Sequence, residues 1–220
     1  MTGAPQLYII TDRHATAGRP LPSVIATALA GAAPAIRAGA RVAVQLREKD
    51  LPARPLLALA RELRAVTAAA GAALFVNDRV DVALAVGADG VHLGGRSLAP
   101  ADVAAIARSL PVAVSLHHPD ELAAASRHPN VRFVVFGPVY WTPEKTAPVG
   151  LAGPRGLAAA VAAANQSPTP VPILALGGVE PPHVPECIGA GAAGVACIRA
   201  VLSDTSPDRV VAQIMFYLQN

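Results

Sequence analysis

The stretch AGARVAVQLREKD, residues 38–50, combines three features that indicate the fold. It begins with a glycine-containing turn, continues as the apolar run VAVQL (42–46), and ends in charged residues. Near-continuous apolar runs are typical of strands buried on both faces, as in a parallel sheet covered by helices. The stretch therefore predicts a helix that ends at glycine, a short turn, and a buried strand with a polar carboxyl end.

Runs of the same kind recur along the chain, separated by segments with helical spacing such as 55–70 and 102–109. The predicted strands are LYIIT (7–11), VAVQL (42–46), ALFVN (73–77), GVHL (90–93), VAVSL (112–116), FVVFG (133–137), PILAL (172–176) and GVACI (194–198). Eight such units in 220 residues fit a compact (β/α)8 barrel better than a doubly wound sheet. We see no interdomain linker, so we expect residues 1–220 to form one α/β domain, a TIM barrel of parallel strands.

The composition argues against membrane proteins and nucleic-acid-binding proteins. Hydrophobic residues make up 53% of the chain, but no apolar run reaches the roughly 18–20 residues of a membrane span. The net charge is only +3, Lys and Arg form no block, and aromatic residues make up 4%. A nucleic-acid surface normally needs clustered basic residues. We therefore expect no membrane and no nucleic acid as partner, but small anionic ligands.

Two further features concern the location of the protein. The segment MTGAPQLYIITD (1–12) has no basic region ahead of an apolar one, so we expect no signal peptide. Cys187 and Cys197 fit neither a metal-ligand spacing nor a disulfide framework. We expect a cytoplasmic protein with two buried thiols. The sequence does not determine the oligomeric state, and a homo-oligomer is compatible with it.

Polar or glycine-rich residues follow the predicted strands, at the end of the barrel where active sites lie in this fold. These residues are Thr11, Asp12, Arg47, Glu48, Lys49, Asn77, Asp78, His92, Ser115, His117, Thr142, Lys145, Gly177, Gly178, Ile198 and Arg199. Any one of them is explained as well by a strand that leaves the core. Together they would collect several cations, an Asn-Asp pair and a glycine turn on one face.

That combination indicates phosphate chemistry. Arg and Lys side chains bind phosphate oxygens, Arg through two parallel hydrogen bonds. The turn Gly177-Gly178 can expose backbone N–H groups, and it follows strand seven, near the usual phosphate site of this fold. An Asp beside an Asn, as in Asn77-Asp78, suits Mg²⁺, which takes one or two carboxylates and keeps water and phosphate oxygens.

Six motifs carry a resemblance to a known family. They are QLREK, NDRVDVALAVGADGVHLG, the S-x-H of SLHH, FGPVYWTPEK, ALGGV and AGVACIRAV. Their order resembles that of thiamine phosphate synthases, and of the sister family of thiazole tautomerases, over about residues 7–202. The resemblance implies a (β/α)8 transferase of thiamine biosynthesis. Such an enzyme joins hydroxymethylpyrimidine diphosphate to a thiazole phosphate and releases diphosphate with Mg²⁺.

The resemblance also implies roles for individual residues. The residues implied to hold the diphosphate are Arg47, Lys49, Asn77, Ser115 and Lys145. Gln45 would contact the pyrimidine, and Asp78 would bind Mg²⁺. The residues implied at the thiazole phosphate are Thr142, Gly178 and the turn at Ile198. Alternation along the strand points Glu48 away from Gln45, Arg47 and Lys49, so we expect Glu48 to be structural.

Three positions depart from the synthase pattern. Ser97 stands where synthases carry a second Mg²⁺-binding Asp, which weakens the expected metal site. Glu144 and Arg199 replace a Thr and a Ser beside the thiazole phosphate, and we hypothesise that they pair across the barrel mouth. Ser97 points toward the tautomerases, which need no metal and in which His117 would transfer a proton. The alternatives to a synthase are therefore a thiazole tautomerase or a non-catalytic binder of phosphate ligands.

Overall fold

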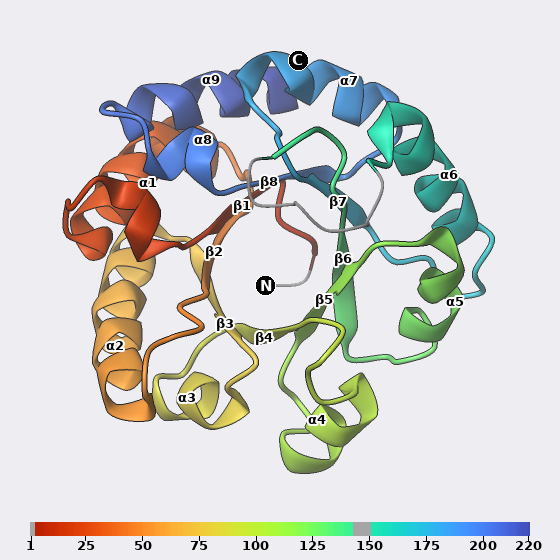
Figure 1. Ribbon diagram of the computed structural model, residues 1–220, viewed down its shortest axis with the longest axis horizontal. Coiled ribbons are helices and arrows are strands. Elements are labelled where there is room, and N and C mark those ends of the chain that lie inside the picture. Colours follow the sequence, from red (N-terminus) through yellow and green to blue (C-terminus); the bar gives the residue numbers. More distant parts are fainter. Residues whose placement is uncertain (1–2, 143–150) are drawn as a thin grey trace.

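The structure, a computed structural model, describes residues 3–142 and 151–220. Its strands close into a barrel in chain order, and all neighbouring strands are parallel (Figure 1). The strands are β1 (Leu7–Ile10), β2 (Val42–Leu46), β3 (Ala73–Asn77), β4 (Gly90–Leu93), β5 (Val112–Leu116), β6 (Val131–Phe136), β7 (Ile173–Leu176) and β8 (Gly194–Cys197). The predicted (β/α)8 barrel is confirmed, with strand bounds within two residues of the expected ones.

Helices surround the ring of strands (Figure 1). In the described chain they are α1 (Leu21–Arg37), α2 (Ala53–Ala70), α3 (Val80–Ala85), α4 (Pro100–Ile106), α5 (Leu122–Ala125), α6 (Gly153–Asn165), α7 (Val184–Gly189), α8 (Arg199–Leu202) and α9 (Pro207–Gln219). Short 3₁₀ helices are η1 (Arg13–Thr16), η2 (Pro119–Glu121) and η3 (Pro181–His183). The expected segments 55–70 and 102–109 correspond to α2 and α4.

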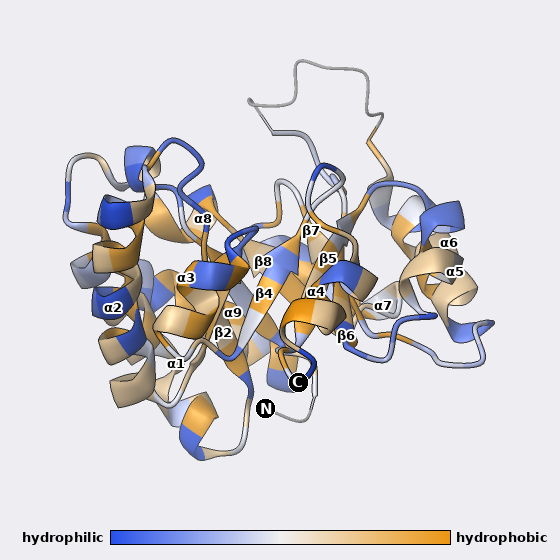
Figure 2. Ribbon diagram, turned by 90° about the horizontal axis from the view of Figure 1, so that it is seen from below, coloured by the Kyte–Doolittle hydropathy of each residue, from blue (hydrophilic) through white to orange (hydrophobic). Residues whose placement is uncertain are grey.

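The strands separate two apolar layers. Along β1, Tyr8 and Ile10 belong to the cluster inside the barrel, whereas Leu7 and Ile9 pack against the helices outside. Both sets are buried, which explains why the strands are apolar without interruption. Figure 2 shows the other pattern on the outer helices, where hydrophilic and hydrophobic residues alternate along α2.

The turn between α1 and β2 has the predicted form. Gly39 lies at φ 96°, a backbone conformation that side chains with a Cβ rarely adopt. Its N–H donates to the carbonyl of Ile36, and the N–H of Ala40 donates to the carbonyl of Ala35. These bonds end α1 and lead into β2 within a few residues.

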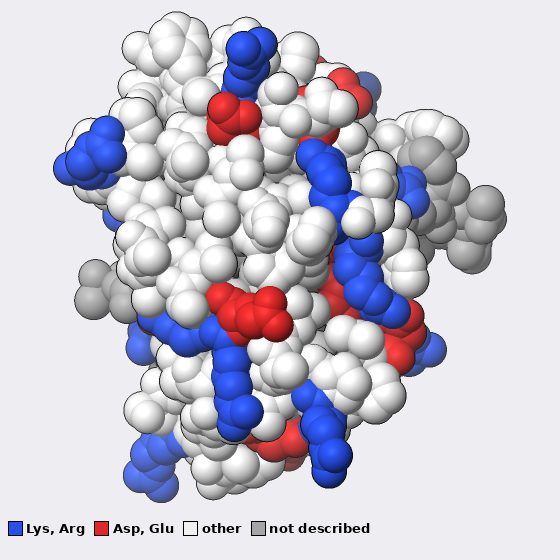
Figure 3. All heavy atoms as spheres, turned by 90° about the vertical axis from the view of Figure 1, so that its left-hand side faces the viewer, with Lys and Arg blue, Asp and Glu red and all other residues white. Residues whose placement is uncertain are grey.

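Charged residues are spread over the outer surface. On the face in Figure 3, Lys and Arg side chains lie scattered, and several have Asp or Glu beside them. Ion pairs of the described chain include those of Arg64 with Asp89 and of Arg79 with Asp81. Within residues 3–142 and 151–220, none of the helices has both the length and the apolar character of a membrane span. The cysteines are unpaired and buried, as expected.

Candidate active site

A pocket of about 1240 Å³ opens at the carboxyl ends of the strands. It is lined by every described residue to which a binding or catalytic role was predicted, namely Gln45, Arg47, Lys49, Asn77, Asp78, Ser115, His117, Thr142, Gly178, Ile198 and Arg199, but not by Thr11 or Asp12. Lys145, also predicted, and Glu144 lie outside the described residues. In the described part of the barrel, the strand ends therefore gather around one pocket, as predicted. The role of each residue stays a prediction.

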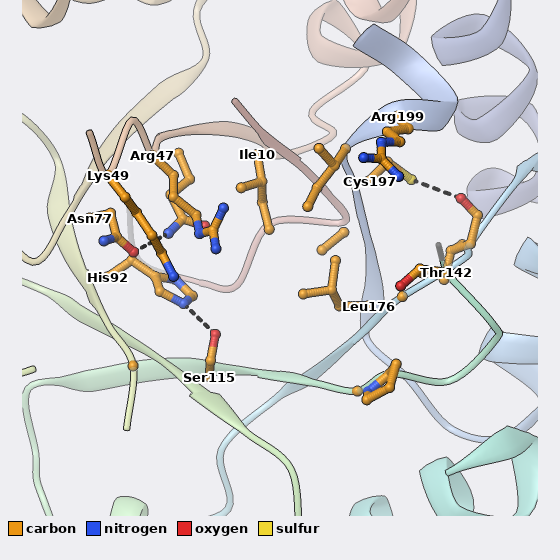
Figure 4. Close-up of a pocket in the computed structure, with 18 of the residues that line it drawn as sticks. Ile10, Arg47, Lys49, Asn77, His92, Ser115, Thr142, Leu176, Cys197 and Arg199 are labelled. Atoms are coloured by element: carbon orange, nitrogen blue, oxygen red, sulfur yellow. Dashed lines mark hydrogen bonds between the residues drawn. The ribbon is translucent and has the colours of Figure 1, made fainter. Parts of the chain in front are cut away.

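The polar end of β2 divides between the pocket and the barrel wall. Gln45 is only 1% exposed inside the barrel, and Figure 4 shows Arg47 and Lys49 beside the pocket. Glu48 turns the other way, and its side chain is 2% exposed. Its carboxylate accepts hydrogen bonds from Thr11 Oγ1 at 2.7 Å and from the Arg13 backbone and guanidinium. These contacts confirm that the carboxylate of Glu48 points away from the pocket, while its structural role stays a prediction.

The cations that follow β2 and β4 repel one another. Partial burial lowers the pKa of Lys49, and so do the positive charges of Arg47 and Arg96, while Asp78 acts in the opposite direction. Arg96 lines the pocket, but no role was predicted for it. Its only signal in the sequence was its place directly before Ser97. Cations held together without full compensation attract an anionic ligand.

A chain of side-chain amides orients the end of β3. Gln45 Nε2 donates to Asn77 Oδ1 at 3.0 Å, and Asn77 Nδ2 donates to Asp78 Oδ2 at 2.8 Å. Asp78 has φ 60°, which is uncommon for a residue with a side chain. The bonds fix which way both amides face. As a consequence, the Gln45 Oε1 atom is buried with no partner in the described chain.

Ser97 faces the site and contacts Asp78. Its hydroxyl donates to Asp78 Oδ1 and accepts from the Gly94 N–H at 2.7 Å. The described residues hold no group of three or more His, Cys, Asp or Glu side chains that could bind a metal. Mg²⁺ needs fewer, because it takes one or two carboxylates and keeps several waters. One carboxylate with a neighbouring hydroxyl fits such a sparse Mg²⁺ site.

His92 was noted at the end of β4, but no role was predicted for it. Its ring is 2% exposed and lies between Tyr8 and Ser115. The Nδ1 atom is 3.3 Å from Tyr8 Oη, and Nε2 is 2.7 Å from Ser115 Oγ (Figure 4). Burial, and then the charge of Arg47, lower the pKa of His92 to about 3, so the ring is neutral near pH 7.

His117 follows β5 and has different partners. Its Nδ1 atom is hydrogen-bonded to the carbonyl oxygen of Gly137, and its backbone N–H donates to Glu121 Oε2 at 2.7 Å. A carbonyl oxygen only accepts, so Nδ1 carries the proton of this bond. In the neutral ring Nε2 is then an acceptor, which can take up a proton.

The ends of β6 to β8 bring the glycine turn Gly177-Gly178 to the pocket, with fewer charged side chains in the described chain than the ends of β2 to β5. Gly178 lies at φ 60°, and a Cβ there would stand 2.5 Å from the carbonyl oxygen of Trp141. The N–H of Tyr140 donates to the carbonyl of Gly177 at 2.8 Å, which ties the two loops together. Ile198 begins the turn into α8. Figure 4 shows Thr142 and Arg199 on this side of the pocket.

His183 lines the pocket, although no role was predicted for it. Its ring stacks on that of Tyr140 with 4.2 Å between centroids and 17° between planes. The Tyr140 hydroxyl donates to Glu186 Oε2 at 2.6 Å. Tyr140 is more than 40 residues away from His183 and Glu186 in the sequence, and no local pattern marks it as their neighbour.

Comparisons with known proteins agree with this geometry. The family model described as thiamine monophosphate synthase matches residues 7–201. A Geobacter sulfurreducens protein, provisionally named a thiamine-phosphate synthase, is 47% identical over 91% of this chain and 88% of its own. The thiamine-phosphate synthase of Roseiflexus castenholzii is 38% identical over 94% and 85%.

A solved structure gives the same result in three dimensions. The thiamine phosphate pyrophosphorylase of Pyrococcus furiosus superposes with a TM-score of 0.82 at 29% identity, covering 97% of this chain and 95% of that one. The family match spans most of the chain, including the described strands and the pocket residues that follow them. The chain belongs to the thiamine monophosphate synthase family.

Proposed function

We propose that the protein is a thiamine phosphate synthase, a transferase that joins hydroxymethylpyrimidine diphosphate to a thiazole phosphate and releases diphosphate. The observation that carries this proposal is the convergence of Arg47, Lys49, Asn77 and Asp78 on one pocket, in a chain of this family. The pocket volume of about 1240 Å³ leaves room for two small substrates side by side.

In this proposal the leaving diphosphate lies at the ends of β2 to β5. Arg47 and Lys49 bind its oxygens through charge-assisted hydrogen bonds, with Asn77 and Ser115 as further donors and Lys145 as a further cation. The bond between the pyrimidine methylene and oxygen breaks, and its electron pair leaves with diphosphate. The thiazole nitrogen then forms the new carbon–nitrogen bond. No protein nucleophile is needed, since catalysis consists of positioning and charge neutralisation.

The pyrimidine is proposed to lie against Gln45. A buried carbonyl oxygen without a donor is costly, so the unpartnered Gln45 Oε1 favours a ligand that brings an N–H group. The hydrogen bond from Gln45 Nε2 to Asn77 fixes the Gln45 amide in the orientation that leaves Oε1 without a partner. An amino group on the pyrimidine would supply the missing donor.

Asp78 would hold Mg²⁺, with the Ser97 hydroxyl beside it. When bound, Mg²⁺ would neutralise charge on the departing diphosphate. A single carboxylate binds Mg²⁺ weakly, so we expect the metal to bind mainly together with diphosphate. One carboxylate and one hydroxyl are enough for such a site, so a second carboxylate is not needed.

The thiazole phosphate is proposed to lie at the opposite side, at Thr142, Gly178, the turn at Ile198, and Arg199. Glycine permits close approach of the backbone to an anion, and Arg199 adds a positive charge. The pairing of Arg199 with Glu144 stays a hypothesis, because Glu144 lies outside the described residues.

A thiazole tautomerase is the second candidate, and one observation favours it. The bond from His117 Nδ1 to Gly137 leaves Nε2 as an acceptor, as a proton-transfer histidine requires. Such an isomerase needs no metal and no diphosphate substrate.

The test is incubation with both synthase substrates, with and without Mg²⁺, while thiamine phosphate and diphosphate are measured. A synthase forms both products in equal amounts and slows strongly in EDTA. Proton exchange on the thiazole ring without product formation would favour the tautomerase. Binding of both ligands without any turnover would leave the non-catalytic phosphate binder.

Four further expectations stay predictions. They are a single domain over residues 1–220, a cytoplasmic location, no nucleic-acid partner, and an oligomeric state that is open to a homo-oligomer. Small phosphorylated substrates follow from the family and the proposed activity.

A further inference from the structure

A row of hydrogen bonds runs from the barrel interior to the pocket through three strands. Tyr8 on β1 contacts His92 Nδ1 at 3.3 Å, and His92 Nε2 contacts Ser115 Oγ on β5 at 2.7 Å. Tyr8 is fully buried and His92 is 2% exposed, whereas Ser115 is half-buried and lines the pocket. The row therefore begins in the core and ends at the ligand site.

The first member of the row is held firmly. Tyr8 makes edge-to-face contacts with Phe75 and Phe133, at centroid distances of 5.8 Å and 5.2 Å. Its ring also lies against that of His92, with 5.8 Å between centroids and 26° between planes. Aromatic contacts on several sides leave the ring one orientation. The Tyr8 hydroxyl is thereby directed at His92.

This geometry selects one tautomer of His92. Within the described chain, Tyr8 Oη has no hydrogen-bond partner besides His92 Nδ1. If Nδ1 carried the ring proton, the Tyr8 O–H would be buried without an acceptor, which is costly. With the proton on Nε2, Tyr8 donates to Nδ1 and Nε2 donates to Ser115. Every buried donor of the row is then satisfied.

We propose that Tyr8 and His92 are positioning residues that direct the hydroxyl proton of Ser115 at an anionic ligand in the pocket. Because Ser115 Oγ accepts from His92, its own proton has to be donated elsewhere, and the pocket is the side left open. In the opposite tautomer Ser115 would donate to His92 and present lone pairs to the anion. The ligand is the diphosphate of the proposed function, on which this inference rests.

His117 provides an internal comparison in the same barrel mouth. Its Nδ1 faces the carbonyl of Gly137, so the structure assigns it the opposite tautomer, with the proton on Nδ1. His92 on β4 and His117 after β5 should therefore differ in a measurement that reports tautomers directly.

The first test is a long-range ¹H–¹⁵N correlation spectrum of the labelled full-length protein without ligand, near neutral pH. We expect His92 to be protonated at Nε2 and not at Nδ1, and neutral His117 to show the reverse. The variant His92→Gln assigns the signals by the loss of one set. A proton on His92 Nδ1, or on both nitrogens, would overturn the proposal, and this readout does not depend on any activity.

The second test is calorimetric titration with inorganic diphosphate. We expect Tyr8→Phe to weaken binding about 3- to 10-fold, the range for one lost hydrogen bond. His92→Leu should weaken it at least as much. His92→Gln should recover most of the affinity, because an amide can accept from Tyr8 and donate to Ser115. The control Tyr217→Phe removes a hydroxyl on α9, outside the pocket, and should change nothing.

Thermal unfolding of each variant shows whether it folds. Unchanged affinity in folded Tyr8→Phe, or a His92→Gln protein no better than His92→Leu, would overturn the positioning role. A wild-type protein that binds no diphosphate would overturn the proposed function, and with it the role given to Ser115. The tautomer spectrum of the wild type stands apart from both results.

Discussion

Across the barrel mouth, the ends of β2 to β5 form a side-chain half of charged and hydrogen-bonding groups, whereas the ends of β6 to β8 form a backbone half, named for the closely packed Gly177-Gly178 turn. Figure 4 shows Arg47, Lys49 and Asn77 on the first side and Thr142 and Arg199 on the second. On the first side the side chains are linked to one another, as in the bond from Gln45 to Asn77. On the second side loops approach so closely that Gly178 leaves no room for a Cβ.

This difference predicts how substitutions in each half affect activity and stability. A side-chain half loses function when a charge or donor is removed, while its backbone keeps the same path. A backbone half loses function when an atom is added, because the loops have to move apart. We therefore expect variants on the two sides to separate activity from stability in opposite ways.

The largest effect is expected from Arg47→Ala and Lys49→Ala. Each removes a charge-assisted contact to phosphate, which costs about 1.5–3 kcal/mol, or roughly a tenfold to hundredfold loss of turnover with the diphosphate substrate. The melting temperature should not change. Arg37→Ala removes the same charge from the exposed end of α1 and is the control. Normal turnover with reduced stability would make this strand end structural.

Glu48→Ala should be an exception among the variants of the side-chain half and lower stability, because the Glu48 side chain lies in the barrel wall. Its loss leaves the Thr11 hydroxyl and the Arg13 backbone N–H without their acceptor, which should lower the free energy of unfolding by about 1–3 kcal/mol. Turnover should fall as well, since Arg47 and Lys49 flank this anchor.

Chemical denaturation measures that loss, with Asp81→Ala as its control. Asp81 makes an exposed ion pair with Arg79, worth about 1 kcal/mol or less. Equal effects of the two substitutions would show that Glu48 anchors nothing.

Gly178→Ala tests the backbone half. The residue lies at φ 60°, where a side chain costs about 1–2 kcal/mol, and the new Cβ would meet the carbonyl oxygen of Trp141. Stability and affinity for the thiazole phosphate should fall, while affinity for diphosphate is kept. At Gly189 an added Cβ meets nothing within 4 Å, so Gly189→Ala is the matched control. A selective loss of diphosphate binding in Gly178→Ala would reverse the assignment of the two halves.

The smallest effect is expected from Ser97→Asp, which adds a carboxylate beside Asp78. Metal affinity rises with the number of charged ligands, and we expect Mg²⁺ to bind about tenfold more tightly, with higher synthase activity. Titration of activity against Mg²⁺ measures the change. Ser97→Asn has a similar size without charge and should leave Mg²⁺ affinity low. An unchanged Mg²⁺ affinity in Ser97→Asp would remove Asp78 from the metal site.

The two halves also differ in how far the sequence predicted them. Arg47, Lys49, Asn77 and Asp78 follow apolar strands directly, so their positions at one end of the barrel could be predicted from the strand pattern. Glu48 was predicted to turn away by alternation alone. The resemblance to a known family supplied the roles, which residue types and spacing could not distinguish.

What the sequence did not predict depends on contacts between distant segments. The bond of His92 to Tyr8 joins β4 to β1, and the stack of His183 on Tyr140 joins η3 to the loop after β6. Such pairs follow from the closure and register of the barrel. No local period in the sequence encodes them, so neither His183 nor His92 received a predicted role.

The most direct test of this account is a crystal structure of the protein with inorganic diphosphate, Mg²⁺ and a thiazole phosphate bound together. We predict that diphosphate lies within hydrogen-bond distance of Arg47, Lys49 and Ser115, and that the thiazole phosphate lies beside Gly178 and the turn at Ile198. Diphosphate bound beside Gly178, or both ligands bound on one side of the pocket, would contradict the division of the barrel mouth into these two halves.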